Sequence, residues 1–331
     1  MIYTFLGRTG LKASVIGIGA GGPSRLGLGY GGSADDAVRL IRFGLDRGIN
    51  VIDSAVTYGT EQIVGKAIKD CRPKVVLSTK ATLGPYFGGL DGYRSIARLA
   101  ARLGEVTSCV ASGWALEERV NSSLRRLKTD YIDVFYLHSV TPAQYAPALA
   151  RVLPTLIRLK ETGKIRWIGI TEAFPRDTTH RMLTRAANDG VFDCIMIGFN
   201  CLNQSGAALA AQAKRSRSGV IVMYAVRALR RQESLQVLMD KLVAFGCIEE
   251  NDGDATRLVK MLKTHGVHSL PEAAIRFCRH ELNPDVVLSG TGDTGHLESN
   301  IAACQAGPLP HVVSAEFRKL FSKLNSLTGG E

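Results

Sequence analysis

Short runs of consecutive apolar residues recur along the chain, and each is followed by a segment with helical spacing. Such uninterrupted runs are typical of parallel strands that are buried on both faces. Strands that alternate with helices predict a parallel sheet, and eight repeats of the unit predict closure into a barrel. The eight runs are residues 14–19, 50–55, 74–79, 132–138, 165–171, 194–200, 219–225 and 285–290.

The segments between these runs place apolar residues at the spacing of an amphipathic helix. In residues 34–48 the apolar side chains share one face, acidic residues stand in the first turn, and Gly48 suits the C-terminal stop. Residues 115–127, 147–162 and 205–215 behave similarly. We therefore expect an α/β fold of the (β/α)8 TIM-barrel type, with a doubly wound open sheet as the alternative architecture.

Two connections are longer than the others. Residues 81–112 follow the third predicted strand, and residues 227–270 follow the seventh. Because long loops in compact domains are commonly lids or binding loops, we expect both on the C-terminal face of the barrel, where active sites of such barrels lie. The length of 331 residues fits one large barrel, so we predict a single domain over residues 1–331.

Composition narrows the class of protein. Hydrophobic residues make up 45% and charged residues 21%, which are ordinary globular values. No apolar run approaches the roughly 20 residues that span a bilayer, and the first residues lack the pattern of a secretory signal. We therefore expect a cytoplasmic protein with no membrane partner. The seven cysteines show no C-x-x-C spacing, which indicates reduced thiols and no metal site.

The formal net charge is +11, and such a charge suits nucleic acid, a membrane surface or an anionic ligand. The basic residues are spread along the chain, without the interleaved aromatic residues of single-strand binders. The simpler interpretation of this charge is a solvated basic surface. The more specific interpretation is that it attracts a phosphate-rich cofactor. We expect no nucleic-acid partner, and no sequence signature defines an oligomeric state.

A glycine cluster, GIGAGG at residues 17–22, follows the first predicted strand. The Rossmann fingerprint requires G-x-G-x-x-G leading into a helix, with an acidic residue about 20 positions later. Here the cluster leads into Pro23, so the sequence lacks this fingerprint. A dinucleotide that binds this chain must therefore bind in another way.

Four polar side chains stand at or just after the ends of successive predicted strands. Asp53 ends the second strand and is followed by Tyr58, Lys80 ends the third, and His138 ends the fourth. Each alone has a simpler explanation, as a helix cap, a solvated strand end or a packed core residue. Because the C-terminal ends of barrel strands meet at one rim, their occurrence in order predicts an active site.

These residue types suit hydride transfer to a carbonyl, which leaves negative charge on oxygen and needs a proton donor. Tyrosine is a weak acid with a pKa near 10, and we expect the ammonium of Lys80 to lower the pKa of Tyr58. Asp53 is expected to hold Lys80, and His138 to orient the carbonyl oxygen. A cofactor would carry the hydride, with no metal and no covalent intermediate.

At these residues the chain resembles the aldo-keto reductase family over nearly its whole length. The resemblance implies an N-terminal β-hairpin and a catalytic set of Asp53, Tyr58, Lys80 and His138, with Tyr58 as the acid–base residue. It also implies an NAD(P)(H)-dependent oxidoreductase that acts on a small aldehyde, ketone or sugar. The stretches that carry the likeness include RGINVIDSAVTYG, VVLSTK, SLRRLKTDYIDVFYLH, LKETGKIRWIGIT and GTGDTGHLESNIAA.

The resemblance further implies cofactor contacts, several of them with departures from the family pattern. Thr171 stands where a Ser contacts the nicotinamide carboxamide, Glu172 where an Asn is usual, and Met196 where a Gln is usual. Phe199 replaces a Tyr that stacks on the nicotinamide ring, and Arg227 is expected to reach the pyrophosphate. The other implied contacts are Gly21, Ala225, Gly290, Thr291, Gly292, Asp293, His296 and Asn300.

The choice of dinucleotide stays open at this point. Many NADPH-using members carry a basic residue where Gly292 stands, and here Asp293 is adjacent, which weakens the case for a 2′-phosphate. On family grounds we favour NADP(H) over NAD(H). The chain also resembles the family's sugar dehydrogenases, which oxidise aldoses. The departures at Glu172 and Met196 leave one alternative, a cofactor-binding regulatory module with little turnover.

Overall fold

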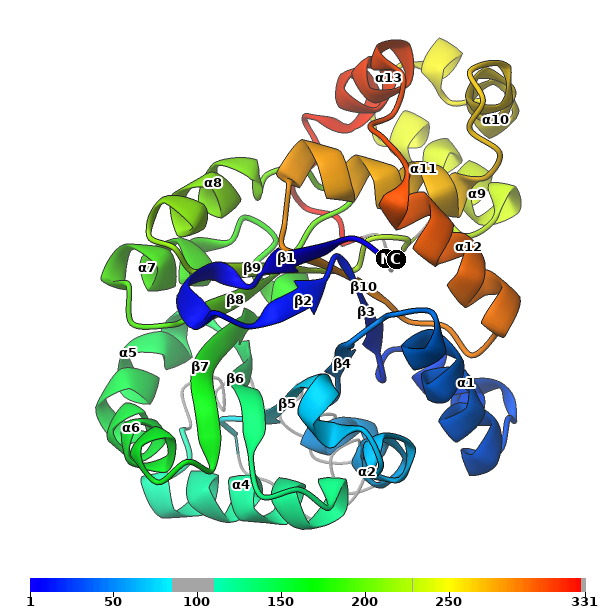
Figure 1. Cartoon of the computed structure of the whole chain (residues 1–331). Helices are drawn as coiled ribbons and strands as arrows, with labels where there is room; N and C mark the ends of the chain where they lie inside the picture. The colour runs from blue at the N-terminus through cyan, green and yellow to red at the C-terminus, as the bar shows by residue number, and fades with distance from the viewer. Residues whose placement is uncertain (85–109, 228, 329–331) are drawn as a thin grey trace.

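The structure, a computed structural model, describes residues 1–84, 110–227 and 229–328. Eight parallel strands close into a barrel in the order β10-β3-β4-β5-β6-β7-β8-β9 (Figure 1). They coincide with the eight predicted apolar runs, so the (β/α)8 barrel is confirmed and the open sheet is wrong. The strands are β3 (Ile16–Gly19), β4 (Val51–Asp53), β5 (Val76–Thr82), β6 (Ile132–Val140), β7 (Ile165–Glu172), β8 (Cys194–Gly198), β9 (Gly219–Met223) and β10 (Val286–Ser289).

An antiparallel hairpin precedes the barrel, formed by β1 (Tyr3–Phe5) and β2 (Lys12–Ser14). Just after β1, Leu6 is 2% exposed and belongs to the same apolar cluster as Val51 and Val134 inside the barrel. The backbone N–H of Arg8 donates to the carbonyl of Arg217, shortly before β9 begins. The hairpin therefore covers the end at which the strands begin, and the opposite end carries the strand C-termini.

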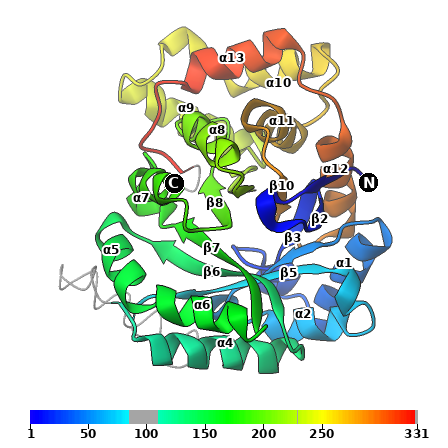
Figure 2. The same cartoon turned by 60° about the vertical axis from the view of Figure 1, so that its left-hand side comes forward.

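Helices surround the barrel (Figures 1 and 2). No helix in the described part of the chain has the length and apolar character needed to cross a membrane. The helices are α1 (Ala34–Asp46), α2 (Glu61–Ile68), α4 (Gly113–Leu127), α5 (Pro142–Arg151), α6 (Leu153–Glu161), α7 (Arg181–Asp189), α8 (Ala207–Arg215), α9 (Gln232–Ala244), α10 (Ala255–Thr264), α11 (Leu270–Phe277), α12 (Thr294–Gln305) and α13 (His311–Phe321).

Two features differ from the sequence-based expectation. The predicted helix over 147–162 is two helices, because Pro154 lacks the N–H that a continuous helix would use, and the break falls at Val152. The expected long loop over 227–270 contains α9 and α10, which group with α13 at one side of the barrel (Figure 2). Of the other expected loop, 81–112, residues 85–109 lie outside the described residues.

One kind of hydrogen bond recurs four times toward the N-terminal end of the barrel. In three cases an aspartate before or at the start of one strand accepts a backbone N–H of the preceding barrel strand, and in the fourth an asparagine before β4 accepts a backbone N–H at the end of β2. Because the carboxylates are also paired with basic side chains, their burial is compensated, and their position opposite the strand C-termini indicates a role in stability. The pairs are Asn50 with Ser14, Asp133 with Leu77, Asp193 with Ile168, and Asp285 with Val220.

Candidate active site

The four predicted catalytic side chains lie together at the C-terminal ends of the strands. Asp53 is the last residue of β4, Lys80 lies in β5, and His138 lies in β6. Tyr58 ends a short 3-10 helix (Val56–Tyr58) that follows β4. Neighbouring parallel strands end side by side, and the closed barrel therefore brings these residues to one rim.

Asp53 and Lys80 form a buried ion pair, in which Lys80 Nζ donates to the Asp53 carboxylate. Lys80 Nζ also donates to the carbonyl of Ser54 at 2.9 Å, and Ser78 Oγ donates to the other Asp53 oxygen at 2.7 Å. Burial lowers the pKa of Lys80, and the Asp53 carboxylate acts in the opposite direction. These contacts give the ammonium a fixed position.

Tyr58 lies beside this pair, with Lys80 Nζ 5.2 Å from the centroid of the Tyr58 ring. A β-carbon on Gly21 would lie 2.4 Å from the same ring, so the glycine permits the tyrosine to sit there. Arg25 Nε donates to the carbonyl of Tyr58 at 2.9 Å. The structure thus places Gly21, predicted as a cofactor contact, against the tyrosine.

Burial raises the pKa of Tyr58 well above its ordinary value. The Asp53 carboxylate and Tyr224 raise this pKa further, whereas the Arg227 guanidinium lowers it. The pKa of Tyr58 thus lies above its ordinary value and not below it as expected, because the cost of burying a phenolate dominates. Tyr58 is therefore a neutral phenol that holds its proton.

His138 meets Tyr58 edge to face, with ring centroids 5.7 Å apart and an interplanar angle of 86°. Burial, with a smaller contribution from the Lys80 ammonium, lowers the pKa of His138 to about 3. The imidazole is therefore neutral at physiological pH. Its Nδ1 is buried and has no hydrogen-bond partner, which leaves the ring with an unsatisfied polar atom at the rim.

An aromatic side chain that the sequence analysis missed lies directly after β9. The Tyr224 ring is half-buried, and the Arg227 guanidinium lies 4.0 Å from its centroid. Phe174 stacks on the Tyr224 ring at 5.6 Å. A signal was available, because Tyr224 falls at the end of the predicted strand 219–225, as the other rim residues do in their strands.

Phe199, implied as the ring that stacks on the nicotinamide, lies elsewhere. It is 1% exposed and stacks on Phe277 in the core, with ring centroids 6.0 Å apart. The structure does not present this ring at the rim, whereas Tyr224 is partly exposed there. The Phe199 side chain packs with α11, so the structure gives no support to its assignment as the stacking ring.

Two of the residues implied at the nicotinamide carboxamide, Thr171 and Glu172, have hydrogen-bond partners within the protein. Glu172 is 1% exposed and accepts the N–H of Gly198 at 2.8 Å and a bond from His180 Nδ1 at 2.9 Å. Thr171 Oγ1 accepts the N–H of Ser139 at 2.8 Å. Burial raises the pKa of Glu172, and the bond to His180 opposes that rise. The structure therefore gives the Glu172 carboxylate two partners within the protein.

Met196 and Ala225 are both 2% exposed. Met196 lines a small cavity inside the barrel together with Asp53 and Tyr136. Its side chain therefore faces the barrel interior, beneath the catalytic rim.

The loop after β10 packs against the loop after β3. A β-carbon on Gly292 would lie 2.3 Å from Cα of Gly27, so no larger residue fits at this position. Asp293 Oδ1 accepts the N–H of His296 at 2.7 Å and caps α12, so these two implied cofactor contacts are bonded to each other. Asn300 Nδ2 donates to Ser289 Oγ at 2.9 Å.

The residues at the rim fit a nicotinamide dinucleotide at its nicotinamide end. Tyr224 offers a half-buried aromatic ring with the Arg227 guanidinium over it, and His138 a neutral ring with an unsatisfied nitrogen. Gly290 is exposed at the end of β10, with only ordinary contacts around the place of its missing β-carbon, and Thr291 follows it at the surface. These two residues remain as candidates for the phosphate end.

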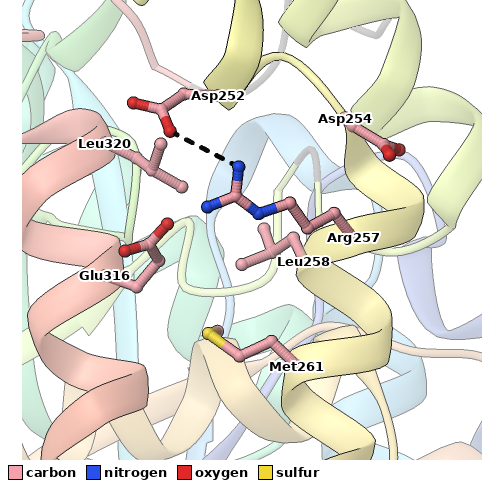
Figure 3. Close-up of a pocket in the computed structure, with 7 residues that line it drawn as sticks. All are labelled: Asp252, Asp254, Arg257, Leu258, Met261, Glu316 and Leu320. Carbon is pink, nitrogen blue, oxygen red and sulfur yellow. Dashed lines mark ion pairs between the residues drawn. The ribbon is translucent and has the colours of Figure 1, made fainter.

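A surface pocket lies between α10 and α13 (Figure 3), and its lining includes none of the rim residues. Arg257 pairs with Asp252 there at 3.9 Å. Three carboxylates and one guanidinium face the pocket, so its acidic lining does not suit an anionic dinucleotide. The lining residues are Asp252, Asp254, Arg257, Leu258, Met261, Glu316 and Leu320.

Comparison of the sequence with known proteins identifies a family. The sequence model described as "Aldo/keto reductase family" matches residues 16–321. L-galactose dehydrogenase of Arabidopsis thaliana is 32% identical over 198 residues, which cover 58% of this chain and 54% of that protein. The chain spans about half the length of the curated relatives it matches.

Two solved structures share the fold across nearly the whole chain. The aldo-keto reductase AKR11C1 from Bacillus halodurans (holo form) superposes with a TM-score of 0.70 at 24% identity, covering 100% of each chain. An aldo/keto reductase from Klebsiella pneumoniae, in complex with NADP and acetate, superposes with a TM-score of 0.63 at 20% identity, covering 96% of this chain and 95% of that one. These likenesses support the fold.

Proposed function

The chain belongs to the aldo/keto reductase family, and from this premise we propose that it is an NAD(P)(H)-dependent oxidoreductase. It moves a hydride between the nicotinamide and a carbonyl or alcohol. The observation that carries the proposal is the meeting of Asp53, Tyr58, Lys80 and His138 at one rim, although they come from three strands and a 3-10 helix. We also propose that the barrel and its helices form one domain.

A bound nicotinamide supplies or accepts the hydride, a step for which side chains are not suited. Tyr58 holds the proton at Oη and gives it to the carbonyl oxygen in reduction, because its raised pKa keeps the phenol protonated. The Lys80 ammonium, held by Asp53, stabilises the charge that Tyr58 acquires when the proton leaves. Neutral His138 orients the substrate oxygen by hydrogen bonding.

Tyr224, Arg227, Gly290 and Thr291 are the residues that we propose to hold the dinucleotide. The Klebsiella pneumoniae structure, described as a complex with NADP, supports NADP(H) over NAD(H). The glycine at position 292 and the carboxylate of Asp293 support the reverse preference, because neither binds a 2′-phosphate. We favour NADP(H), on family grounds.

The substrate proposed is a small aldehyde, ketone or sugar. The sugar class is supported by the likeness to L-galactose dehydrogenase. A regulatory module that binds cofactor with little turnover is the second candidate. It is favoured by one observation, the commitment of Glu172 to His180 and Gly198 in place of a contact with the carboxamide.

The test is a fluorescence titration of the purified protein with NADPH and NADH, followed by absorbance at 340 nm. Aldehydes and ketones are supplied with the reduced cofactors, and aldoses with the oxidised ones. Turnover with either set supports the oxidoreductase and identifies its cofactor and direction. Tight cofactor binding without turnover on any substrate favours the regulatory module, and no binding of either dinucleotide contradicts both candidates.

A further inference from the structure

Glu61 is a buried carboxylate just outside the catalytic rim. It begins α2, three residues after Tyr58, and is 1% exposed. Thr79 Oγ1 donates to one of its oxygens at 2.6 Å, and Arg126 Nε of α4 donates to the other at 2.6 Å. Thr79 immediately precedes Lys80 in β5. Glu61 therefore ties the segment that carries the tyrosine to the strand that carries the lysine.

A second link joins the same two segments. The hydroxyls of Thr60 and Ser54 are 3.1 Å apart, both side chains are fully buried, and the carbonyl of Ser54 accepts the bond from Lys80 Nζ. The contacts thus form a closed circuit that runs from Lys80 through Ser54, Thr60 and Glu61 back to Thr79. Tyr58 lies two residues before Thr60, so this circuit restricts the position of the tyrosine relative to the lysine.

The negative charge of Glu61 also affects Lys80, because it favours the protonated form of the ammonium. Burial lowers the pKa of Lys80, and Glu61 is one of the two carboxylates, with Asp53, that raise it. Its hydrogen-bond partners are Thr79 in β5 and Arg126 in α4, so its carboxylate lies where α2 packs against these two elements. Glu61 therefore influences the rim through Lys80 and through the backbone of α2.

We propose that Glu61 is a positioning residue that keeps Lys80 charged and aligned with Tyr58. The inference rests on the proposed function for its effect on catalysis, but its effect on Lys80 is measurable without turnover. Glu61→Gln keeps the shape and removes the charge. Arg126→Gln is the matched control, because it breaks the ion pair between α2 and α4 and leaves the carboxylate and its bond from Thr79 in place.

The first measurement is the pH titration of the Lys80 Cε resonance in protein labelled with ¹³C-lysine, assigned by comparison with Lys80→Arg. The midpoint for Lys80 is expected to fall by about one pH unit in E61Q, because an opposite charge is lost, and not to fall in R126Q. A merely structural role predicts lower stability in both variants and no change in either midpoint. An unchanged midpoint in folded E61Q overturns the proposal.

The second measurement is kinetic. In E61Q, kcat is expected to fall about 10-fold or more while KM and the cofactor Kd stay nearly constant, because only the alignment of Lys80 and Tyr58 is lost. The alkaline limb of kcat should move to lower pH, since Lys80 loses its proton earlier. If E61Q does not fold, Thr79→Val removes the tie to β5, and an unchanged kcat in that variant overturns the proposal. A wild-type protein without turnover contradicts the proposed function alone, because the Lys80 titration still tests Glu61.

Discussion

The β-carbon that Gly21 lacks would lie 2.4 Å from Cε2 of Tyr58. The turn after β3 and the ring of the proposed proton donor therefore occupy adjoining space, and no side chain fits between them. This explains one glycine of the GIGAGG cluster without a phosphate. The family resemblance implied Gly21 as a cofactor contact, and the structure places it against the ring of the tyrosine.

Gly21→Ala is expected to displace the Tyr58 ring and to lower kcat about 10-fold or more, because a misplaced catalytic group loses its alignment. Gly19→Ala is the matched control at the end of β3, two residues earlier, where the nearest atom to the added carbon is 3.6 Å away. Steady-state kinetics and thermal unfolding of both variants check the prediction. Equal kcat values in the two variants would contradict the importance of this contact.

Tyr58→Phe removes the proton donor and leaves the ring in its place against Gly21. Folding and cofactor binding are expected to persist, while turnover falls by about 10²–10⁴-fold, as for loss of a general acid. Circular dichroism, cofactor titration and kcat measure the three properties. Turnover close to that of the wild type would remove Tyr58 from its proposed role.

His138 predicts a pH dependence of stability. The pKa of His138 is lowered from 6.5 to about 3 in the folded protein, so between these values the unfolded chain binds a proton that the folded chain does not. The free energy of unfolding therefore falls as pH falls through this window, by at most about 1.4 kcal/mol per pH unit from this residue.

His138→Gln removes this contribution, because glutamine does not titrate. Urea unfolding of the wild type and H138Q, at neutral pH and at a pH between 6.5 and 3, gives the change of the unfolding free energy with pH in each protein. All other titratable groups are the same in both proteins. The stability of the wild type is expected to fall more steeply than that of the variant. Parallel pH dependence in the two proteins would contradict the lowered pKa of His138.

Glu172→Gln tests whether this residue contacts the nicotinamide carboxamide or stabilises the fold through His180 and Gly198. An amide oxygen cannot replace both oxygens of the carboxylate toward His180 and Gly198, so the free energy of unfolding is expected to fall by about 1–3 kcal/mol. Cofactor affinity should stay nearly unchanged, as measured by titration. Lost cofactor binding with unchanged stability would instead restore Glu172 as a carboxamide contact.

The sequence by itself determined the barrel and the place of its proposed chemistry. Short continuous apolar runs are typical of strands that are covered on both faces, and eight of them alternating with helices leave few architectures. Asp53, Lys80 and His138 were found because each stands at or near the end of such a run, and parallel strands end at one rim. Both inferences depend on local pattern and on the regular geometry of the barrel.

Only the tertiary structure decided which side chains contact one another. Phe199 and Tyr224 are both aromatic residues near strand ends, yet one packs on Phe277 and the other reaches the rim. A glycine is required at position 292 because the backbone of Gly27, distant in the sequence, packs against it. Glu61 was missed because a glutamate at the start of a helix ordinarily faces solvent and serves the helix dipole. Its burial follows from the packing of α2 against β5 and α4, and residue spacing carries no record of contacts between distant segments.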